Sequence, residues 1–462
     1  MHTSQTAPAT PAAEKLDFKK LLPILTVVLV DLLGLTIIIP LLPLYAASFR
    51  VSPFVIGLLG ATYPLMQLIA APILGSLSDR YGRKPVLVLS QIGTCVGFLL
   101  LGFANTIWLV FVSRIIDGLS GGNIATAQAM VSDSTSEKTR TQGFGLIGAA
   151  FGIGFIIGPV ISFVALALSG NNYHVPAFVA AALSAVSVLL SQFWLQETRV
   201  ERSKSVASPV TLNPAKLFTA FTTPQVGLLL VLMFVQQFAF GGLEQFLPLF
   251  TLSRLGLNGS GNALIFVFVG VIVVAVQGWL LGKWSRRWGE RKLVVAGLTL
   301  IALGLGLTAL TPAEPVPWYN HAAMQQQLHA TDPGAIRQER SRSDVPLPDD
   351  TQTGWLGLGW LLVAMIPASI GGGMVSPSIN SLLTMQLTDQ QHGEVLGTSA
   401  ALVSGANIIA PLVGGVMFQL VGVTAPFWLW MAVVIGVLVL AWQKLGRESA
   451  PAAGVPMEPF QH

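Results

Sequence analysis

The sequence predicts an all-α membrane protein with twelve transmembrane helices in two six-helix bundles, and three observations support this prediction. Hydrophobic residues make up 53% of the 462 residues and charged residues only 10%, whereas soluble domains are about one quarter charged. Stretches of about 20 apolar residues, the length that crosses a bilayer, recur along most of the chain. The strict alternation of a membrane β-barrel is absent from the sequence, so these stretches should be helices.

Two long polar connections divide the predicted spans. Residues 196–222 form a polar linker in the middle of the chain, and residues 312–354 are rich in Pro, Gln, Asp and Arg. The predicted parts are a tail (1–20), a six-helix bundle (21–195), the linker (196–222), a second bundle (223–445) containing the insert 312–354, and a tail (446–462). The predicted spans are approximately 21–47, 53–77, 85–104, 107–132, 141–168, 174–195, 223–250, 262–283, 292–311, 355–384, 396–420 and 424–444.

The distribution of Lys and Arg predicts the orientation. If the N-terminus is cytoplasmic, 19 of the 25 Lys and Arg residues lie inside, 5 lie outside and Arg114 lies within the membrane. Because cytoplasmic loops carry the excess of basic residues, both termini should be inside. The insert 312–354 is then external, either as a solvated loop with little order or as a lid over the outer mouth.

Composition also excludes several classes of function. The net charge of +4 is too small to indicate nucleic acid as a partner, and the single Cys95 permits no internal disulfide. The first apolar stretch is too long for a cleavable signal peptide. The sequence has no G-x4-G-K-[ST] loop and no cluster of metal ligands, so we expect no cofactor and no enzyme activity. Energy for any transport should come from an ion gradient or from the gradient of the substrate.

The two predicted halves resemble each other in sequence. "GSLSDRYGRK" (75–84), after the second span, is answered by "GKWSRRWGERK" (282–292), after the eighth. The fifth and eleventh spans also match, which places Pro159 opposite Pro411. A parallel repeat of six spans is a transporter feature, and it predicts a substrate site at mid-membrane between the halves.

Three segments carry a resemblance to a known family. Residues 75–84 resemble the loop between spans two and three of the major facilitator superfamily, and "RIIDGLSGGNIATAQAMVSD" (114–133) resembles its fourth-span motif, which opens with a membrane-embedded Arg. "GFGLIGAAFGIGFIIGPVIS" (143–162) is similar to its fifth-span antiporter motif, with Ser162 and Phe163 in place of the last two glycines. The first half is most similar to the tetracycline/proton antiporters and their drug-efflux relatives. The matching residues are Gly75, Asp79, Arg80, Gly82, Arg83 and Lys84 in the loop, Arg114 in span four, and Gly145, Gly154, Gly158 and Pro159 in span five.

Four charged residues inside predicted spans are candidates for proton coupling or substrate binding. A carboxylate at mid-bilayer costs about 3 kcal/mol on insertion scales, so Asp31 should face a watery cavity, or else serve as a structural hydrogen-bonding group. Arg114 and Asp117 are three residues apart and share a helix face. They could simply neutralise each other, or Arg114 could interact with Asp31 or a substrate. Glu244 has no Lys or Arg nearby in its span, so it is either a proton-coupling or substrate residue or lies closer to water than the sequence indicates.

Two further predictions concern the loop 75–84 and the glycine-rich fifth span. Asp79 should face the N-terminus of span eleven near residues 393–397, where the helix dipole favours an anion. Arg83 should reach Asp133 at the inner end of span four, and both contacts would hold the cytoplasmic side shut. The fifth-span glycines predict close helix packing and a pliable interface between the halves. Polar residues that could line the cavity, or alternatively bond neighbouring helices, are Gln67, Asn123, Gln128, Gln236, Gln277, Asn380 and Asn407.

The sequence therefore favours one function and leaves two alternatives open. The favoured hypothesis is a proton-coupled antiporter that exports hydrophobic or amphipathic small molecules, acts as a monomer and resides in a bacterial inner membrane. The first alternative is a uniporter or symporter for a metabolite such as a sugar or an organic anion. The second is a membrane receptor or assembly protein without transport activity, which the intact 75–84 motif disfavours. Fold alone cannot choose among them, because function depends on the site.

Overall fold

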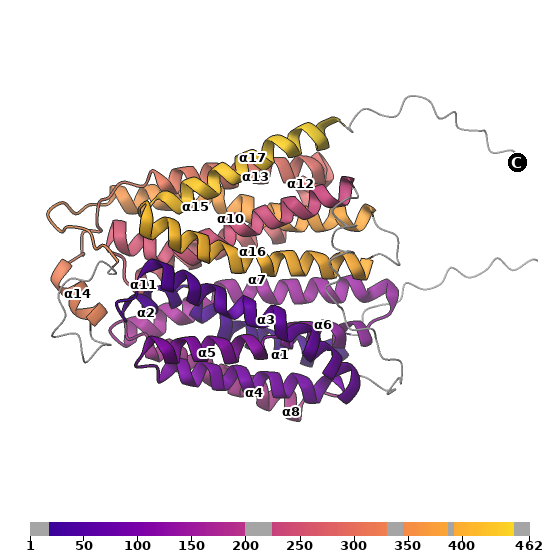
Figure 1. The fold of residues 1–462 in the computed structure, drawn as a ribbon. Helices are drawn as coiled ribbons and strands as arrows, with labels where there is room; N and C mark the ends of the chain where they lie inside the picture. The colour runs from indigo at the N-terminus through magenta and orange to yellow at the C-terminus, as the bar shows by residue number, and fades with distance from the viewer. Residues whose placement is uncertain (1–17, 199–223, 330–344, 387–391, 448–462) are drawn as a thin grey trace, which may run out of the picture.

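The computed structural model describes residues 18–198, 224–329, 345–386 and 392–447, and all of its regular elements in these ranges are helical (Figure 1). Twelve of its helical segments are long and apolar enough to cross a membrane, as predicted. The first part of the chain forms α1 (Phe18–Ile38), α2 (Leu42–Ala47), α3 (Pro53–Tyr81), α4 (Arg83–Gly102), α5 (Ile107–Ser120), α6 (Asn123–Asp133), α7 (Glu137–Leu168) and α8 (His174–Phe193). The second part forms α10 (Pro224–Leu255), α11 (Gly259–Ala275), a π-helix η1 (Val276–Leu280), α12 (Leu281–Trp288), α13 (Glu290–Ala309), α14 (His321–His329), α15 (Leu356–Gln386), α16 (His392–Leu420) and α17 (Ala425–Arg447).

Three predicted spans differ in detail from the observed helices. The span predicted at 21–47 is broken by a turn at Pro40 into α1 and α2, since proline removes a backbone donor. The span predicted at 107–132 breaks at Gly121 and Gly122, between α5 and α6. The span predicted at 262–283 continues to Trp288 through the π-helical turn η1.

The two ends of the molecule are easily told apart. We call the end that carries the 75–84 loop and α12 the loop end, and the end that carries α14 the insert end; they lie at the right and left of Figure 1. Helices α3 and α7, from the first part of the chain, pack against α16 and α11 from the second part. These two pairs join the two parts of the chain.

The two parts are packed tightly near the insert end. A Cβ atom added to Gly57 of α3 would overlap the carbonyl oxygen of Pro411 in α16, and one added to Gly415 would lie 2.6 Å from the carbonyl oxygen of Pro53. The Phe54 N–H donates to Gln419 Oε1 at 3.2 Å. We call these α3–α16 contacts the insert-end seal.

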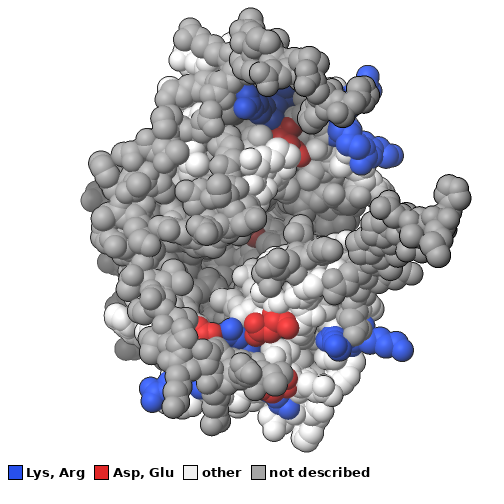
Figure 2. Space-filling model, turned by 90° about the vertical axis from the view of Figure 1, so that its right-hand side faces the viewer, with Lys and Arg blue, Asp and Glu red and all other residues white. Residues whose placement is uncertain are grey.

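Packing is looser toward the loop end. Cβ atoms added to Gly148, Gly278 or Gly405 would meet none of the described heavy atoms within 4 Å. Figure 2, which views the loop end, shows this face hollowed between its upper and lower parts. The molecule is therefore closed at the insert end and more open at the loop end.

The fifth-span glycines serve two helix contacts. Gly154 and Gly158 lie against Leu32 and Thr36 of α1, so the close packing of these two residues is with a helix of the first half. A Cβ atom added to Gly152, on another face of α7, would lie 3.4 Å from Val274 Cγ2 of α11. A Cβ added to Gly145 meets no described atom within 4 Å. The helix thus packs on α1 with one face and on α11 with another.

The described flanks of the insert 312–354 are ordered, so the expectation of a solvated loop with little order is wrong for them. The Val316 N–H donates to the carbonyl oxygen of Leu255 at 3.0 Å, and the Gly354 N–H donates to that of Pro315 at 2.8 Å. Tyr319 is buried against Gly256, which has a left-handed φ of 63°. These described flanks are therefore docked on the insert end of α10.

Candidate functional site

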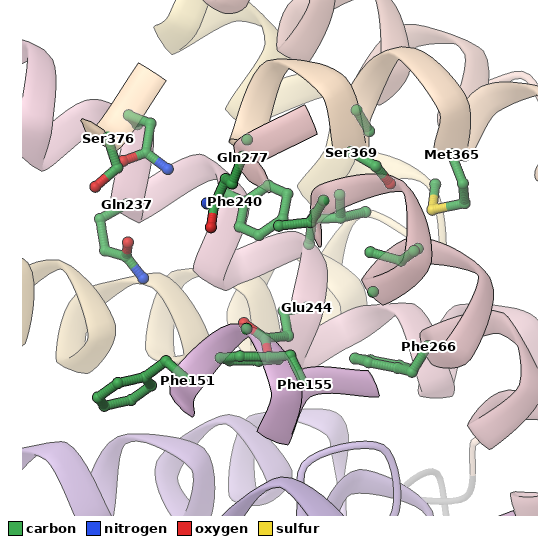
Figure 3. Close-up of a pocket in the computed structure, with 18 of the residues that line it drawn as sticks. Phe151, Phe155, Gln237, Phe240, Glu244, Phe266, Gln277, Met365, Ser369 and Ser376 are labelled. Atoms are coloured by element: carbon green, nitrogen blue, oxygen red, sulfur yellow. The ribbon is translucent and has the colours of Figure 1, made fainter. Parts of the chain in front are cut away.

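A cavity of about 460 Å³ lies among α7, α10, α11, η1 and α15, and we call it the aromatic cavity (Figure 3). Phe151 and Phe155 of α7 form one wall, and Phe240 of α10 and Phe266 of α11 contribute further rings. Its volume is within the range of sites that bind drug-sized molecules. These phenylalanines could not be predicted as site residues, because nothing in a uniformly apolar helix shows which side faces a cavity.

Among the described residues, Glu244 of α10 is the one acidic residue that lines the aromatic cavity, and none of the lining residues is Lys or Arg. Within the described part of the chain, Glu244 forms neither an ion pair nor a hydrogen bond. Burying an ionised carboxylate without a cation or hydrogen-bond donors is costly. The other polar lining groups are uncharged and belong to Gln236, Gln237, Gln277, Ser369 and Ser376.

A second cavity of about 260 Å³ adjoins the first, and we call it the polar cavity. Both cavities are lined by Phe155, Gln237 and Glu244, so Glu244 lies where they meet. The second cavity is formed between α1, α2, α3 and α5 on one side and α10 and α16 on the other, next to the insert-end seal. Its further polar lining residues are Tyr63, Gln67, Arg114, Gln245 and Asn407.

Hydrogen bonds hold some of the polar lining residues in place. Gln67 Nε2 donates to the carbonyl oxygen of Gly121 at 2.9 Å, and Gln237 Nε2 donates to Asn407 Oδ1 at 2.9 Å. Gln245 Nε2 is buried and has no hydrogen-bond partner. Of the predicted cavity residues, Gln67 and Asn407 line the polar cavity and Gln236 and Gln277 the aromatic cavity. Gln128 and Asn380 are exposed and line neither.

Arg114 and Asp117 form a buried ion pair, which is one of the two alternatives that their spacing left open. Arg114 Nη1 lies 3.1 Å from Asp117 Oδ2, and both side chains are 2% exposed. The Arg114 guanidinium lies over the Phe98 ring, 5.5 Å from its centroid. Arg114 Nε and Nη2 have no hydrogen-bond partner, while the side chain lines the polar cavity. The ion-pair partner of Arg114 in this state is therefore Asp117, and not Asp31, which was the other alternative.

Asp31 lies apart from both cavities. Asn123 Nδ2 donates a hydrogen bond to Asp31 Oδ2, and Asp31 Oδ1 has no partner. The pocket around Asp31 has a volume of only about 10 Å³, which is no more than one water molecule needs. In this state Asp31 has no room beside it for a substrate. The contact it makes is the structural alternative, a hydrogen bond between neighbouring helices.

One of the two contacts predicted for the 75–84 loop is observed. Arg83 Nε donates to Asp133 Oδ2 at 3.1 Å, as predicted, and Arg83 Nη1 lies 2.7 Å from Asp79 Oδ1. The side chains at 393–397, which were expected opposite Asp79, lie outside the described residues. Sequence reasoning missed Glu197, whose carboxylate accepts hydrogen bonds from the backbone N–H groups of Arg83 and Lys84 at 3.0 and 3.1 Å.

Comparison with known proteins assigns this arrangement to a class. The sequence model of the Major Facilitator Superfamily matches residues 24–324, so the chain belongs to this family of membrane transporters. It is therefore an integral, multi-pass membrane protein and a transporter of small molecules rather than an enzyme. This assignment agrees with the resemblance found in the sequence.

Relatives among curated proteins are named as tetracycline and multidrug resistance proteins. The chain is 28% identical to "Tetracycline resistance protein, class B" of Escherichia coli over 400 residues, which is 86% of this chain and 87% of that protein. It is 27% identical to "Tetracycline resistance protein, class H" of Pasteurella multocida, covering 94% and 98% of the two chains. It is 26% identical to "Multidrug resistance protein 2" of Bacillus subtilis (strain 168), covering 92% and 96%.

Solved structures share the fold. The human organic anion transporter MFSD10 is 21% identical, with a TM-score of 0.57 and coverage of 93% of this chain and 100% of that one. The nucleoside transporter NupG is 14% identical, with a TM-score of 0.67 and coverage of 93% and 99%. These likenesses concern the fold alone.

Proposed function

We propose that the protein is a proton-coupled antiporter that exports hydrophobic or amphipathic small molecules by alternating access. The observation that carries this proposal is Glu244, a carboxylate without a partner among the described residues, at the junction of an aromatic and a polar cavity. The names of the relatives, tetracycline and multidrug resistance proteins, favour efflux. Glu244 is the proposed coupling residue, with Arg114, Asp117 and Asp31 as a supporting charge cluster.

The proposed cycle begins in the state described above. With the insert-end seal closed, a substrate enters the aromatic cavity from the loop end and packs against the four phenylalanine rings. A cationic substrate displaces the proton of Glu244. The resulting carboxylate is the only negative charge that the described lining residues offer to the substrate. Opening of the seal then exposes the polar cavity. A proton that enters from the insert end returns to Glu244 and releases the substrate.

The topology completes the proposal. The loop end and both termini are cytoplasmic, the insert end is external, and the membrane is a bacterial inner membrane. This orientation rests on the excess of Lys and Arg at the loop end. A monomer suffices, because both cavities are formed within one chain. In this cycle Gly75, Asp79, Arg80, Gly82, Arg83, Lys84 and Asp133 form the cytoplasmic gate, which closes the loop end when the insert-end seal opens.

The main alternative, a uniporter or symporter of a metabolite, is less well supported by the site. An organic anion in the aromatic cavity would lie beside Glu244 without a cation to bind it, since no Lys or Arg lines that cavity. Burying an anion in this cavity without a cation to pair with it would be costly. Sugars need many convergent hydrogen-bonding groups, whereas this cavity is lined mainly by apolar side chains.

Transport by reconstituted protein tests the proposal. Proteoliposomes containing the wild type should move ethidium, an amphipathic cation, when a pH gradient is imposed, and should move little without it. Collapsing the gradient with an uncoupler provides the control in the same vesicles. Ethidium movement that is equally fast with and without the gradient would contradict proton-coupled antiport.

A further inference from the structure

Helix α12 presents a basic face at the loop end that the proposed transport cycle does not use. Lys283, Arg286 and Arg287 are spaced at i, i+3 and i+4, so they lie on one side of the helix. All three are exposed, and exposed Lys292 follows at the beginning of α13. Figure 2 shows mainly basic side chains in the upper part of the loop end, whereas acidic side chains accompany the basic ones in the lower part.

The corresponding loop of the first half uses its basic residues differently. There Arg83 bonds Asp79, Asp133 and Ser78, and Lys84 Nζ donates to the carbonyl oxygen of Gln192 at 2.8 Å. In the second half, Lys283, Arg286 and Arg287 form no ion pair or hydrogen bond with any described residue. The acid of this segment, Glu290, instead accepts a hydrogen bond from Ser285 at 2.6 Å. The sequence repeat is therefore preserved, but the charges of Lys283, Arg286 and Arg287 are not neutralised by an ion pair within the described part of the protein.

The basic face continues from an exposed tryptophan in the same candidate membrane span. Trp279 lies one helical turn before Lys283 and is 76% exposed, while Gln277, two residues earlier, lines the aromatic cavity on another side. Both tryptophans of α12 are also exposed or half-buried, and Trp284 stacks on Trp288 with 5.8 Å between ring centroids. The candidate membrane span Gly259–Trp288 includes α12, so these groups lie where the span leaves the bilayer. Tryptophan rings and basic side chains are both favoured at that level.

We propose that the face formed by Trp279, Lys283, Arg286 and Arg287 binds the headgroup of an anionic membrane phospholipid. The lipid phosphate accepts charge-assisted hydrogen bonds from the two guanidinium groups, and its acyl chains lie along the apolar part of the span beside Trp279. A zwitterionic phospholipid carries a cation in its headgroup that opposes these same side chains. The face therefore selects an anionic headgroup over a zwitterionic one.

Native mass spectrometry of the delipidated full-length protein tests this inference. The wild type should bind phosphatidylglycerol about tenfold or more tightly than phosphatidylcholine, since each basic residue at a membrane surface contributes several-fold. The variant K283Q/R286Q/R287Q should lose most of this preference. The charge-preserving variant K283R/R286K/R287K should keep it, which separates loss of charge from loss of folding.

A matched control and a competition complete the design. The variant R337Q/R340Q/R342Q also removes three positive charges, but from the insert, and should bind like the wild type. Inorganic phosphate at the same concentration should not displace phosphatidylglycerol, because it lacks acyl chains. The inference is overturned if K283Q/R286Q/R287Q keeps the wild-type preference, if both triple variants lose it equally, or if inorganic phosphate competes as well as the lipid.

Discussion

At the scale of single residues, Glu244 and Asp31 illustrate how two membrane-embedded acids can differ. Asp31 accepts a hydrogen bond from Asn123 in a pocket of about one water molecule, whereas Glu244 lies between two cavities of about 460 and 260 Å³. Sequence position alone could not separate them, because both are isolated acids in apolar helices. The helix packing gives Glu244, but not Asp31, access to cavity space, and this difference supports Glu244 as the proposed coupling residue.

The first prediction compares these two acids. Glu244→Gln should abolish the dependence of ethidium binding on pH, because it removes the carboxylate that a proton and a cation share. In the wild type, ethidium should bind more tightly as pH rises, since fewer protons then compete for Glu244. Asp31→Asn should retain this pH dependence. Equilibrium fluorescence titrations across a pH series provide the measurement, with Glu290→Gln, at the loop end, as a control.

The opposite result has a clear meaning. If Asp31→Asn removes the pH dependence and Glu244→Gln keeps it, the proton is carried in the Asp31 pocket, and the two-cavity account is wrong.

The second prediction concerns the aromatic lining. Phe155 lines both cavities, and Phe155→Ala should weaken ethidium binding by about tenfold, because an aromatic contact and its buried area are worth roughly 1–2 kcal/mol. Phe193→Ala, a change at an 83% exposed ring, should leave the affinity unchanged. Equal affinities of the Phe155 and Phe193 variants would place the substrate elsewhere.

At the scale of helices, the contacts at the two ends of the molecule differ in kind. The insert-end seal depends on Gly57 and Gly415, where α3 and α16 approach so closely that side chains would collide with backbone. The loop end depends on polar contacts, in which Glu197 binds the N-terminus of α4 and Arg83 joins α4 to α6. One end is therefore sensitive to side-chain volume and the other to charge.

The third prediction follows from the seal. Gly57→Ala should shift the protein away from the described state, because the new methyl group overlaps the Pro411 carbonyl oxygen. Spin labels at Phe54→Cys and Leu420→Cys, with Cys95→Ser, should show a longer distance in this variant. Gly405→Ala, which adds a methyl group to α16 where no described atom is within 4 Å, is the matched control. Identical distance distributions for all three proteins would refute the seal.

The fourth prediction concerns Glu197. Glu197→Ala should destabilise the protein by about 1 kcal/mol, because two N–H groups at the beginning of α4 lose their anionic acceptor. The apparent Tm in detergent should fall by about 1–3 °C, a small shift because the chain is long. Gln196→Ala, at the neighbouring exposed position, should change the Tm less. A smaller loss for the Glu197 variant than for the Gln196 variant would show that the contact does not stabilise α4.

The sequence was sufficient to predict the membrane helices, but not their breaks or the residues that line the cavities. Both outcomes have physical reasons. Twelve spans were predictable because a bilayer demands long apolar helices. The Arg83–Asp133 contact was predictable because charges at the ends of spans have few partners. The breaks at Pro40 and at Gly121–Gly122 were not, since such residues also occur within membrane helices. The lining phenylalanines could not be predicted, because lipid and an aromatic cavity select the same residue types.

At the scale of the whole molecule, the described state orders its parts along one axis. From the insert end they are the docked insert, the seal, the polar cavity, Glu244, the aromatic cavity and the hollowed loop end. This order places the proposed coupling residue between a closed and an open end. Alternating access then requires only that the seal opens while the loop end closes, as expected for two halves that rock about a central site.

The central claim is that one carboxylate, Glu244, exchanges a proton for the substrate, and proton release on binding tests it most directly. Ethidium should be added to the purified protein in weakly buffered detergent solution while pH is monitored with an indicator dye, at a pH where Glu244 is protonated in the absence of ligand. The account predicts release of about one proton per bound ethidium in the wild type and none from Glu244→Gln. Ethidium binding to the wild type without proton release, across the pH range in which it binds, would contradict the account.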